Sequence, residues 1–583
     1  MNQTQNSDFA SSEAQGEQLR RYESDRKWWQ DGIIYQIYPL TFADANGDGI
    51  GDLQGITKRL DYLNDGNPDS KTSLGIDAIW LSPINRSPMS DNGYDVSDYY
   101  DISAKFGTLG DFEILIAEAH KRSIKIIFDL VINHTSNQHS WFLESSSSKT
   151  NSKQDWYHWQ DPAPDGGVPN NWLSYFGGSG WTFNEARQQY YYHTFNKNQP
   201  DINWNNAEVK AEIFKIIRYW LDKGVDGFRL DASSVYSKDK YYRYNPMKFD
   251  AHDKNNYNNL HHLYNKNLPE NHQIIKEIRS IVDEYDERVL IGETFIDSSL
   301  GVSNSFYGVN NDELQLPFAF QFAMSPWYPG HLQQEIYEKE LLTPKGAWAT
   351  YFLDNHDIPR HLSRWIECSL CNNPLGIAQA AAAILLTVKG TPFLYYGQEI
   401  GMVDNEEIPE DKIKDRVVVK TDTEETPPTR DGARTPMQWD DSVHAGFSFG
   451  KDVEPWLPVN KNYKEVNVAS ELAKEDSVFN FYRRLIKVRK NSKALRQGDW
   501  YTLIYYPYEH LAYVREFENE KVLIIINFSY EKEFVIDKEI EANNWRVLVS
   551  NVLEDDWIID LPKMLQSFEV TILRRERDSE ELE

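Results

Sequence analysis

The 583-residue sequence predicts an α/β protein built on a parallel (β/α)8 TIM barrel, with a loop subdomain and a C-terminal all-β domain. Short apolar strand patterns alternate with helix-period patterns through most of the chain, which indicates βα units and a parallel sheet. Three of the strand patterns end close to a carboxylate, at Asp231, Glu293 and Asp357. Because the carboxyl ends of barrel strands share one face, we expect these three side chains to meet there.

Eight strand patterns follow one another along the chain, as a closed barrel requires. A helix-period run over 110–122 leads into the third, and a second run over 209–221 leads into the fourth. Gly224 is the expected stop signal of that second helix. The strand patterns cover 32–39, 78–81, 124–130, 227–230, 289–291, 314–320, 348–353 and 391–396, of which 314–320 is the weakest.

Two segments are too long to be simple connections between barrel elements. Residues 134–199, rich in Trp, Asn, Gly and Tyr, are expected to form a subdomain B after the third strand. Residues 402–467, with Pro, Gly and acidic runs, form a long loop after the eighth strand. The catalytic barrel then takes 28–133 and 200–494.

The pattern of the sequence changes near its C-terminal end. An amphipathic helix is expected over 470–491, and short alternating strands then predict a β-sandwich over 495–573. The polar segment 1–27 and the charged segment 574–583 are expected to be disordered tails.

Charge and composition restrict the class of ligand. The formal net charge of −29 argues against nucleic acid, anionic membranes and phosphorylated substrates. Eighteen Trp and 34 Tyr are more than a core needs, and aromatic faces suit sugar rings. A small neutral ligand and a structural cation are therefore expected, with no organic cofactor.

Neither the cysteines nor any apolar segment indicates a further function. Cys368 and Cys371 form a CxxC pair without the second pair that a structural zinc site needs, and no redox context surrounds them. The N-terminus has no apolar leader, and no run of 18 apolar residues occurs. We expect a cytoplasmic protein without membrane spans, either a monomer or a homodimer.

Oxygen-bearing side chains recur at alternate positions after the first strand, as in the first half of a calcium loop. The closing bidentate Glu of an EF-hand is missing, because Gly55 stands at its position. A self-contained loop around one Ca²⁺ or Mg²⁺ ion is expected, with a metal-free Asx-rich turn as the alternative. The ligands would be Asp44, Asn46, Asp48, the Ile50 carbonyl and Asp52.

The charged strand ends fit the chemistry of retaining glycoside hydrolysis. That reaction needs a carboxylate nucleophile and a carboxylic acid, and it passes through a cationic transition state. Arg229 would keep one carboxylate ionised, whereas apolar neighbours such as Ile291 and Phe295 would raise the pKa of Glu293. These arguments leave open which carboxylate takes which part.

Five short motifs follow one another along the chain: DLVINH at 129–134, QPDIN at 199–203, GFRLD at 227–231, GE at 292–293 and NHD at 355–357. In this order they resemble motifs of the α-amylase family, glycoside hydrolase family 13. A pocket segment, DNGYDVSDY at 91–99, resembles the α-glucosidase and oligo-1,6-glucosidase branch of that family, as do RTPMQW at 434–439 and PWLPVN at 455–460.

The resemblance implies a part for each site residue. Asp231 would be the nucleophile, Glu293 the general acid/base and Asp357 the stabiliser of the transition state. The residues expected to contact the terminal glucose are Asp91, Tyr94, His134, Arg229, His356 and Arg434. The loop over 44–52 would bind calcium.

The leading expectation is an exo-acting α-glucosidase that releases α-1,4-linked glucose from maltose and short malto-oligosaccharides. Ala232 after the nucleophile favours that linkage, because a Val here accompanies α-1,6 activity in the branch. The insertion over 64–73 resembles some bacterial α-amylases instead. Alternatives are an oligo-1,6-glucosidase and a transglycosylase or isomerase of sucrose, maltose or trehalose. A non-catalytic transporter subunit is disfavoured, because the carboxylate triad is intact.

Overall fold

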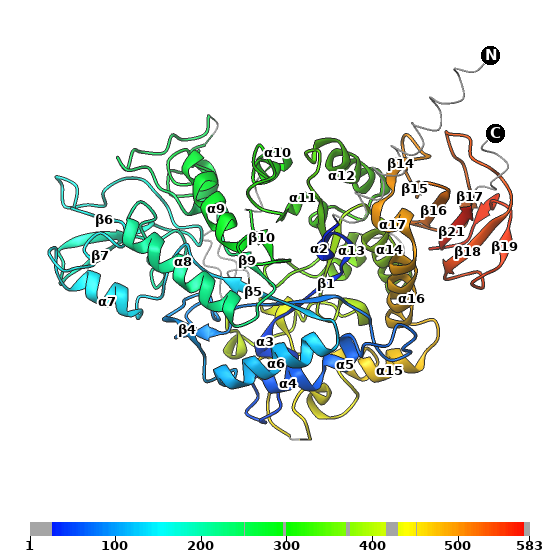
Figure 1. Ribbon diagram of the computed structural model, residues 1–583, viewed down its shortest axis with the longest axis horizontal. Coiled ribbons are helices and arrows are strands. Elements are labelled where there is room, and N and C mark those ends of the chain that lie inside the picture. Colours follow the sequence, from blue (N-terminus) through cyan, green and yellow to red (C-terminus); the bar gives the residue numbers. More distant parts are fainter. Residues whose placement is uncertain are drawn as a thin grey trace, which may run out of the picture.

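The computed structural model describes residues 26–249, 251–294, 299–368, 373–415, 429–450 and 452–576. Its centre is an eight-stranded parallel sheet in the order β11-β10-β9-β5-β2-β1-β13-β12, which confirms the predicted barrel class (Figure 1). The strands of this sheet are β1 (Ile34–Ile37), β2 (Ala78–Leu81), β5 (Lys125–Leu130), β9 (Gly227–Leu230), β10 (Val289–Gly292), β11 (Leu316–Pro317), β12 (Thr350–Phe352) and β13 (Thr391–Tyr395).

The first barrel strand along the chain lies between the second and the last, as it does in a closed barrel. β1 pairs in parallel with β2 and with β13, so the two ends of the sheet are β11 and β12. The Thr350 hydroxyl of β12 donates a hydrogen bond to the Pro317 carbonyl of β11 over 2.7 Å. β11 is the predicted weak sixth strand, shortened to two residues.

Close packing between β9 and β10 depends on glycine at the first position of β9. A Cβ atom on Gly227 of β9 would lie 2.3 Å from the Val289 carbonyl oxygen of β10. Any other residue would push these two strands apart. In the register of β9 against β10, Arg229 lies beside Ile291.

The predicted helices before the third and fourth strands are present, with bounds shifted by one or two residues. Helix α8 begins after the Asn206 cap and buries an apolar stripe that includes Ile213 and Trp220. Trp220 stacks on Phe128 of β5, with ring centroids 4.4 Å apart. Full burial of such a side chain contributes about 1.5–3 kcal/mol, so this stripe anchors α8 on the barrel.

The predicted amphipathic helix over 470–491 is wrong in one respect, because it is two helices. α15 ends at Ala473, and α16 begins at Val478 after the Ser477 cap. The Ser477 hydroxyl accepts a hydrogen bond from the Asn480 backbone amide, which is a new helix start. The helices are α2 (Trp28–Asp31), α3 (Pro39–Phe42), α4 (Leu53–Lys58), α5 (Leu60–Leu63), α6 (Leu109–Lys121), α7 (Ser140–Ser147), α8 (Ala207–Asp222), α9 (Pro269–Val282), α10 (Leu300–Ser305), α11 (Phe320–Ala323), α12 (Pro329–Leu342), α13 (His361–Cys368), α14 (Pro374–Thr387), α15 (Val468–Ala473), α16 (Val478–Asn491) and α17 (Lys493–Gln497).

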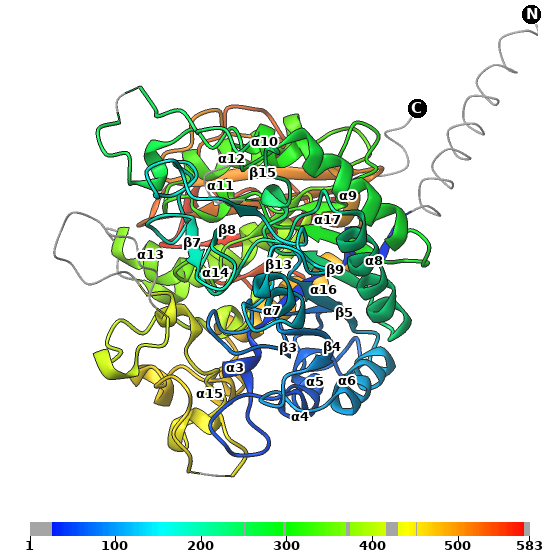
Figure 2. The same ribbon diagram turned by 90° about the vertical axis from the view of Figure 1, so that its left-hand side faces the viewer.

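The segment after β5 carries a small sheet of its own, which lies away from the barrel strands at the left of Figure 1 and faces the viewer in Figure 2. It consists of β6 (Trp159–Gln160), β7 (Trp181–Asn184) and β8 (Gln189–Tyr192) in the antiparallel order β6-β8-β7. A shorter hairpin, β3 (Asn85–Arg86) with β4 (Asp98–Ile102), follows β2 and was not predicted. Both lie in loops that follow the carboxyl ends of barrel strands.

The C-terminal part is all-β and antiparallel, as predicted, and lies at one end of the molecule (Figure 1). One sheet has the order β14-β15-β16-β21-β18-β19, and a second pairs β17 with β20. The last strand extends three residues beyond the predicted end at 573. The strands are β14 (Asp499–Thr502), β15 (His510–Phe517), β16 (Glu520–Asn527), β17 (Lys532–Glu533), β18 (Trp545–Ser550), β19 (Ile558–Ile559), β20 (Met564–Leu565) and β21 (Val570–Glu576).

Some sequence predictions concern residues outside the described part of the chain. Residues 1–25 and 577–583 of the predicted tails are among them, and so are Phe295 and Cys371. Only the backbone of Cys368 is described. Within the described ranges, no helix is both long enough and apolar enough to cross a membrane.

Candidate active site

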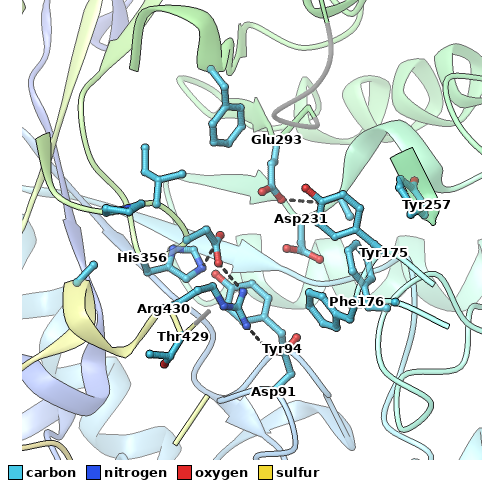
Figure 3. A pocket seen from close by; sticks show the side chains of 18 of the residues that line it. Asp91, Tyr94, Tyr175, Phe176, Asp231, Tyr257, Glu293, His356, Thr429 and Arg430 are labelled. Atoms are coloured by element: carbon cyan, nitrogen blue, oxygen red, sulfur yellow. Dashed lines mark hydrogen bonds and ion pairs between the residues drawn. The ribbon is translucent and has the colours of Figure 1, made fainter. Parts of the chain in front are cut away.

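A cavity of about 460 Å³ opens at the carboxyl ends of the barrel strands. Asp231 follows β9, Glu293 follows β10 and Asp357 lies beyond β12, and all three side chains line this cavity. Figure 3 shows Asp231 and Glu293 side by side in it. The structure therefore brings together the three carboxylates that the strand ends predicted. Other residues that line the cavity include Asp91, Tyr94, His134, Tyr175, Phe176, Phe195, Ala232, Tyr257, His356, Thr429 and Arg430.

Arg229 lies beneath the cavity floor and forms ion pairs with three carboxylates. Its Nη1 lies 2.8 Å from Asp129 Oδ1 and 2.8 Å from Asp231 Oδ1, and its Nη2 lies 2.7 Å from Glu293 Oε2. The guanidinium side chain is only 1% exposed, so water screens these ion pairs very little. One buried cation thus neutralises part of a cluster of carboxylates that would otherwise repel one another.

Asp129 is fixed from two further directions. Trp80 Nε1 donates to Asp129 Oδ2 over 3.1 Å, and the Tyr94 hydroxyl donates to the same oxygen over 3.0 Å. The Tyr94 ring also stacks on His356 with an interplanar angle of 3° and centroids 5.2 Å apart. Tyr94 therefore links the carboxylate layer beneath the cavity to the imidazole that lines it.

His356 presents an N–H group to Asp357. Burial lowers the pKa of His356 well below its ordinary value, so the ring is neutral. Gln36 Nε2 lies 2.8 Å from His356 Nδ1, and as donor it leaves the ring proton on Nε2. That nitrogen lies 3.1 Å from Asp357 Oδ2.

A second cation, Arg430, bridges the opposite side of the cavity. Its Nη1 lies 2.6 Å from Asp357 Oδ1, and its Nη2 lies 3.0 Å from Asp91 Oδ1 (Figure 3). Its Nε donates to Asp415 Oδ2 over 2.6 Å. Gln199 Nε2 donates to the other oxygen of Asp91 over 2.9 Å. The acidic groups that line this side are therefore held in fixed orientations.

Burial raises the pKa of two of the three carboxylates, whereas the third is held ionised by its partners. Burial raises the pKa of Glu293 above its ordinary value, against the opposing effect of Arg229, as the apolar setting predicted. Burial also raises the pKa of Asp231, although Arg229 partly offsets it. Burial alone would raise the pKa of Asp357, but His356, Arg430 and Arg434 together hold it below its ordinary range.

The expectation that Arg229 would distinguish Asp231 from Glu293 is therefore not realised. The physical reason is geometric, because the guanidinium contacts both carboxylates at nearly equal distances of 2.8 and 2.7 Å. The two groups titrate as a coupled pair around one cation. Asp357, with two guanidinium partners, is the carboxylate held most firmly in its ionised form.

Arg434 does not lie where the sequence analysis expected it. Its side chain is 1% exposed and lies behind Asp357, with Nη2 3.1 Å from Asp357 Oδ1 and Nε donating to the His356 carbonyl over 2.6 Å. The cavity position expected for Arg434 is taken by Arg430, which stands four residues before the RTPMQW motif. The sequence analysis missed Arg430 because both arginines stand in one irregular loop, where no periodicity tells which one faces the cavity.

His134 lies at the edge of the cavity, as expected, and its Nε2 lies 2.9 Å from the Tyr94 carbonyl. Aromatic side chains that were not singled out from the sequence form the facing wall. Tyr175 packs edge-to-face on Tyr257, with centroids 5.2 Å apart, and Phe176 lies 5.6 Å from the Arg430 guanidinium carbon. These rings narrow the cavity above the carboxylates.

The loop over 44–52 is folded around its own acidic side chains. Asp44 accepts hydrogen bonds from the Gly49 backbone amide and the Ser448 hydroxyl, over 2.9 and 2.6 Å. Asp52 accepts from the Ala45 and Gly55 amides. In the described ranges, no cluster of three or more His, Cys, Asp or Glu side chains is arranged to hold a metal ion. The calcium site stays a prediction.

Comparison with protein families shows which family the chain belongs to. The model of the α-amylase catalytic domain matches residues 36–498 of this chain. The chain belongs to the α-amylase family. The family resemblance inferred from the short motifs is thereby confirmed, and the protein is a glycoside hydrolase with α-glucosidase homologues.

Relatives cover almost the whole chain. An oligo-1,6-glucosidase of Heyndrickxia coagulans is 39% identical over 563 residues, covering 90% of this chain and 96% of the relative. A probable α-glucosidase of Rhizobium meliloti (strain 1021) is 39% identical over 546 residues, covering 92% and 96%. The solved structure of trehalulose synthase MutB from Pseudomonas mesoacidophila MX-45 is 33% identical with a TM-score of 0.83, covering 94% and 99%.

Replacing Arg430 with Lys should reduce kcat/KM for a small α-glucoside about 100-fold or more, because an ammonium cannot bridge Asp91 and Asp357 in the same way. The melting temperature should fall only moderately, since the lysine keeps the positive charge beside Asp91, Asp357 and Asp415. The matched control is Arg434→Lys, four residues later in the same loop, whose side chain is more deeply buried and which should lower the melting temperature further. An Arg430→Lys enzyme with wild-type kcat/KM would contradict this reading of the cavity.

Proposed function

We propose that this α-amylase-family enzyme is a retaining, exo-acting α-glucosidase that releases α-1,4-linked glucose from maltose and short malto-oligosaccharides. The observation that supports it most is the shape of the cavity, in which Arg430 ties Asp91 to Asp357 across one side. This ion-paired wall would end the site just beyond one sugar ring. A closed end of that kind suits removal of terminal residues and not cleavage within a long chain.

In this proposal Asp231 attacks the anomeric carbon and Glu293 protonates the departing oxygen. The firmly ionised Asp357 suits stabilisation of a cationic transition state. The choice of Asp231 as nucleophile rests on the family motif, since Arg229 contacts both members of the pair. Burial raises the pKa of both Glu293 and Asp231, so the choice of Glu293 as the acid also rests on the family motif. Asp91, His134, His356 and Arg430 would hold the hydroxyl groups of the glucose.

Hydrolysis of α-1,6 linkages is the second candidate, because five relatives that match over more than 90% of their own length are named oligo-1,6-glucosidases. Transfer of glucose to another sugar shares the same covalent intermediate. The solved structure of an α-glucosyl transfer enzyme, XgtA, is 33% identical with a TM-score of 0.83, covering 95% of this chain and 100% of its own. A product analysis with maltose, isomaltose, sucrose, trehalose and starch would separate these activities.

The assigned parts predict different responses to the leaving group. Asp231→Asn should lower kcat/KM about 10⁴-fold or more on every substrate, because an amide does not attack the anomeric carbon. Glu293→Gln should lower kcat/KM about 100-fold or more on maltose, but much less on 2,4-dinitrophenyl α-glucoside, whose leaving group needs little protonation. Equal losses in both variants on both substrates would show that the parts are wrongly assigned.

Linkage preference is expected to depend on Ala232, which lines the cavity beside Asp231. We expect a higher kcat/KM for maltose than for isomaltose, and a ratio that moves toward isomaltose in Ala232→Val. A methyl or two changes such a preference only by about 10–200-fold.

Ala232 has left-handed backbone angles, φ 48° and ψ 40°, which strain a β-branched residue. The valine variant should therefore lose stability, but the ratio of two substrates on one enzyme is insensitive to that loss. Ala232→Gly fits the same backbone and is the matched control, with an unchanged or larger preference for maltose. A wild type that prefers isomaltose, or a valine variant with an unchanged ratio, would exclude this explanation.

For the loop over 44–52 we propose one structural calcium ion, with ligands from Asp44, Asn46, Asp48, the Ile50 carbonyl and Asp52. The exclusively oxygen donor set supports a hard cation. A chelator should lower the melting temperature, and added Ca²⁺ should restore it by mass action.

Asp48→Asn is the most direct variant, since Asp48 is exposed and its replacement leaves the core intact. It should reduce the response to the chelator. Asp165→Asn, in an exposed Asx turn elsewhere, should not. Metal analysis that finds no calcium in protein purified without chelator would exclude the ion and favour the plain turn.

A further inference from the structure

Ser233, two residues after Asp231, is fully buried and contacts the main chain of Glu293. Its hydroxyl donates a hydrogen bond to the Glu293 carbonyl oxygen over 2.6 Å, and its backbone amide donates to the same oxygen over 3.1 Å. Ser233 does not line the cavity. The Ser233 hydroxyl therefore acts on the site indirectly, through Glu293.

The backbone turn at Ala232 makes this contact possible. Its left-handed conformation directs the chain from the end of β9 across to the end of β10. In the same turn, the Ala232 amide donates to Glu293 Oε2 over 3.0 Å. Two consecutive residues thus contact Glu293 at both its carboxylate and its carbonyl group.

The neighbouring backbone of Glu293 is anchored on its other sides. The Glu293 amide donates to the Leu230 carbonyl over 3.0 Å, in continuation of the β9–β10 pairing. The Thr294 hydroxyl donates to the Phe318 carbonyl over 2.7 Å, toward β11. The remaining backbone polar group of Glu293 is its carbonyl. Of the two hydrogen bonds that this carbonyl accepts from Ser233, the one from the hydroxyl is the shorter.

We propose that Ser233 is a positioning residue for Glu293, an inference that rests on the proposed part of Glu293 as general acid/base. Proton transfer requires donor and acceptor within about 2.6–3.2 Å of each other. A misplacement of about 1 Å can cost about 100-fold in rate. By holding the carbonyl, Ser233 limits rotation of the Glu293 peptide and so keeps the carboxyl group directed at the leaving oxygen.

The chain supplies a matched control in the next residue. Ser234 is also fully buried, but within the described part of the chain its hydroxyl has no hydrogen-bond partner. Replacing either serine with alanine removes one buried oxygen from the same short turn. Only Ser233→Ala removes a contact with Glu293.

The test compares kcat/KM for maltose and for 2,4-dinitrophenyl α-glucoside, since kcat/KM reports the step in which the leaving group departs. Ser233→Ala should lower kcat/KM for maltose about tenfold, and for the activated substrate less than about twofold. Ser234→Ala should change neither value by more than about twofold. Ser233→Thr, which retains the hydroxyl, should keep maltose activity within about threefold of the wild type.

Melting temperatures of both alanine variants show whether a loss of activity reflects unfolding. If Ser233→Ala does not fold, Ser233→Cys keeps the volume of the side chain but is a weak donor, and should show the same dependence on leaving group. Equal losses on both substrates, or losses matched by Ser234→Ala, would overturn the positioning of Glu293. Glu293→Gln is measured alongside. If that variant shows no dependence on leaving group, the part given to Glu293 fails, independently of Ser233.

Discussion

The ion pairs of Arg229 are the constraint on which the rest of the site depends. Three carboxylates, Asp129, Asp231 and Glu293, lie within 2.8 Å of its two terminal nitrogens. Removing one partner from a buried ion pair typically costs about 3–5 kcal/mol, because a charge is left unpaired in a medium of low polarity. Without this cation the strand ends of β5, β9 and β10 would place negative charges together with nothing to balance them.

Aromatic side chains around Arg229 suit a buried cation. The ring of Trp80 lies 5.1 Å from its guanidinium carbon and that of Tyr94 lies 5.8 Å away, so aromatic faces complete the environment. At the wall of the cavity, Arg430 likewise forms ion pairs with three carboxylates, those of Asp91, Asp357 and Asp415. Two arginines thus join loops that are as far apart as 339 residues in the sequence.

The sequence predicted those parts of the structure that follow from periodicity or from short motifs. The barrel strands, the helices before the third and fourth strands, and the meeting of Asp231, Glu293 and Asp357 follow from patterns of that kind. It did not distinguish Arg430 from Arg434, because the direction of each side chain depends on an irregular loop with no repeat. The contact between Ser233 and Glu293 was equally hidden, since it depends on the left-handed turn at Ala232.

Charge alone did not separate the nucleophile from the acid, although the sequence suggested that it would. Arg229 contacts both carboxylates, so their difference must come from the position of the substrate between them. The most direct test is to trap the intermediate with 5-fluoro-α-glucosyl fluoride and to map the labelled peptide by mass spectrometry. The account predicts one glucosyl group on Asp231. A label on Glu293 or Asp357, or turnover that releases β-glucose first with no trapped intermediate, would contradict it.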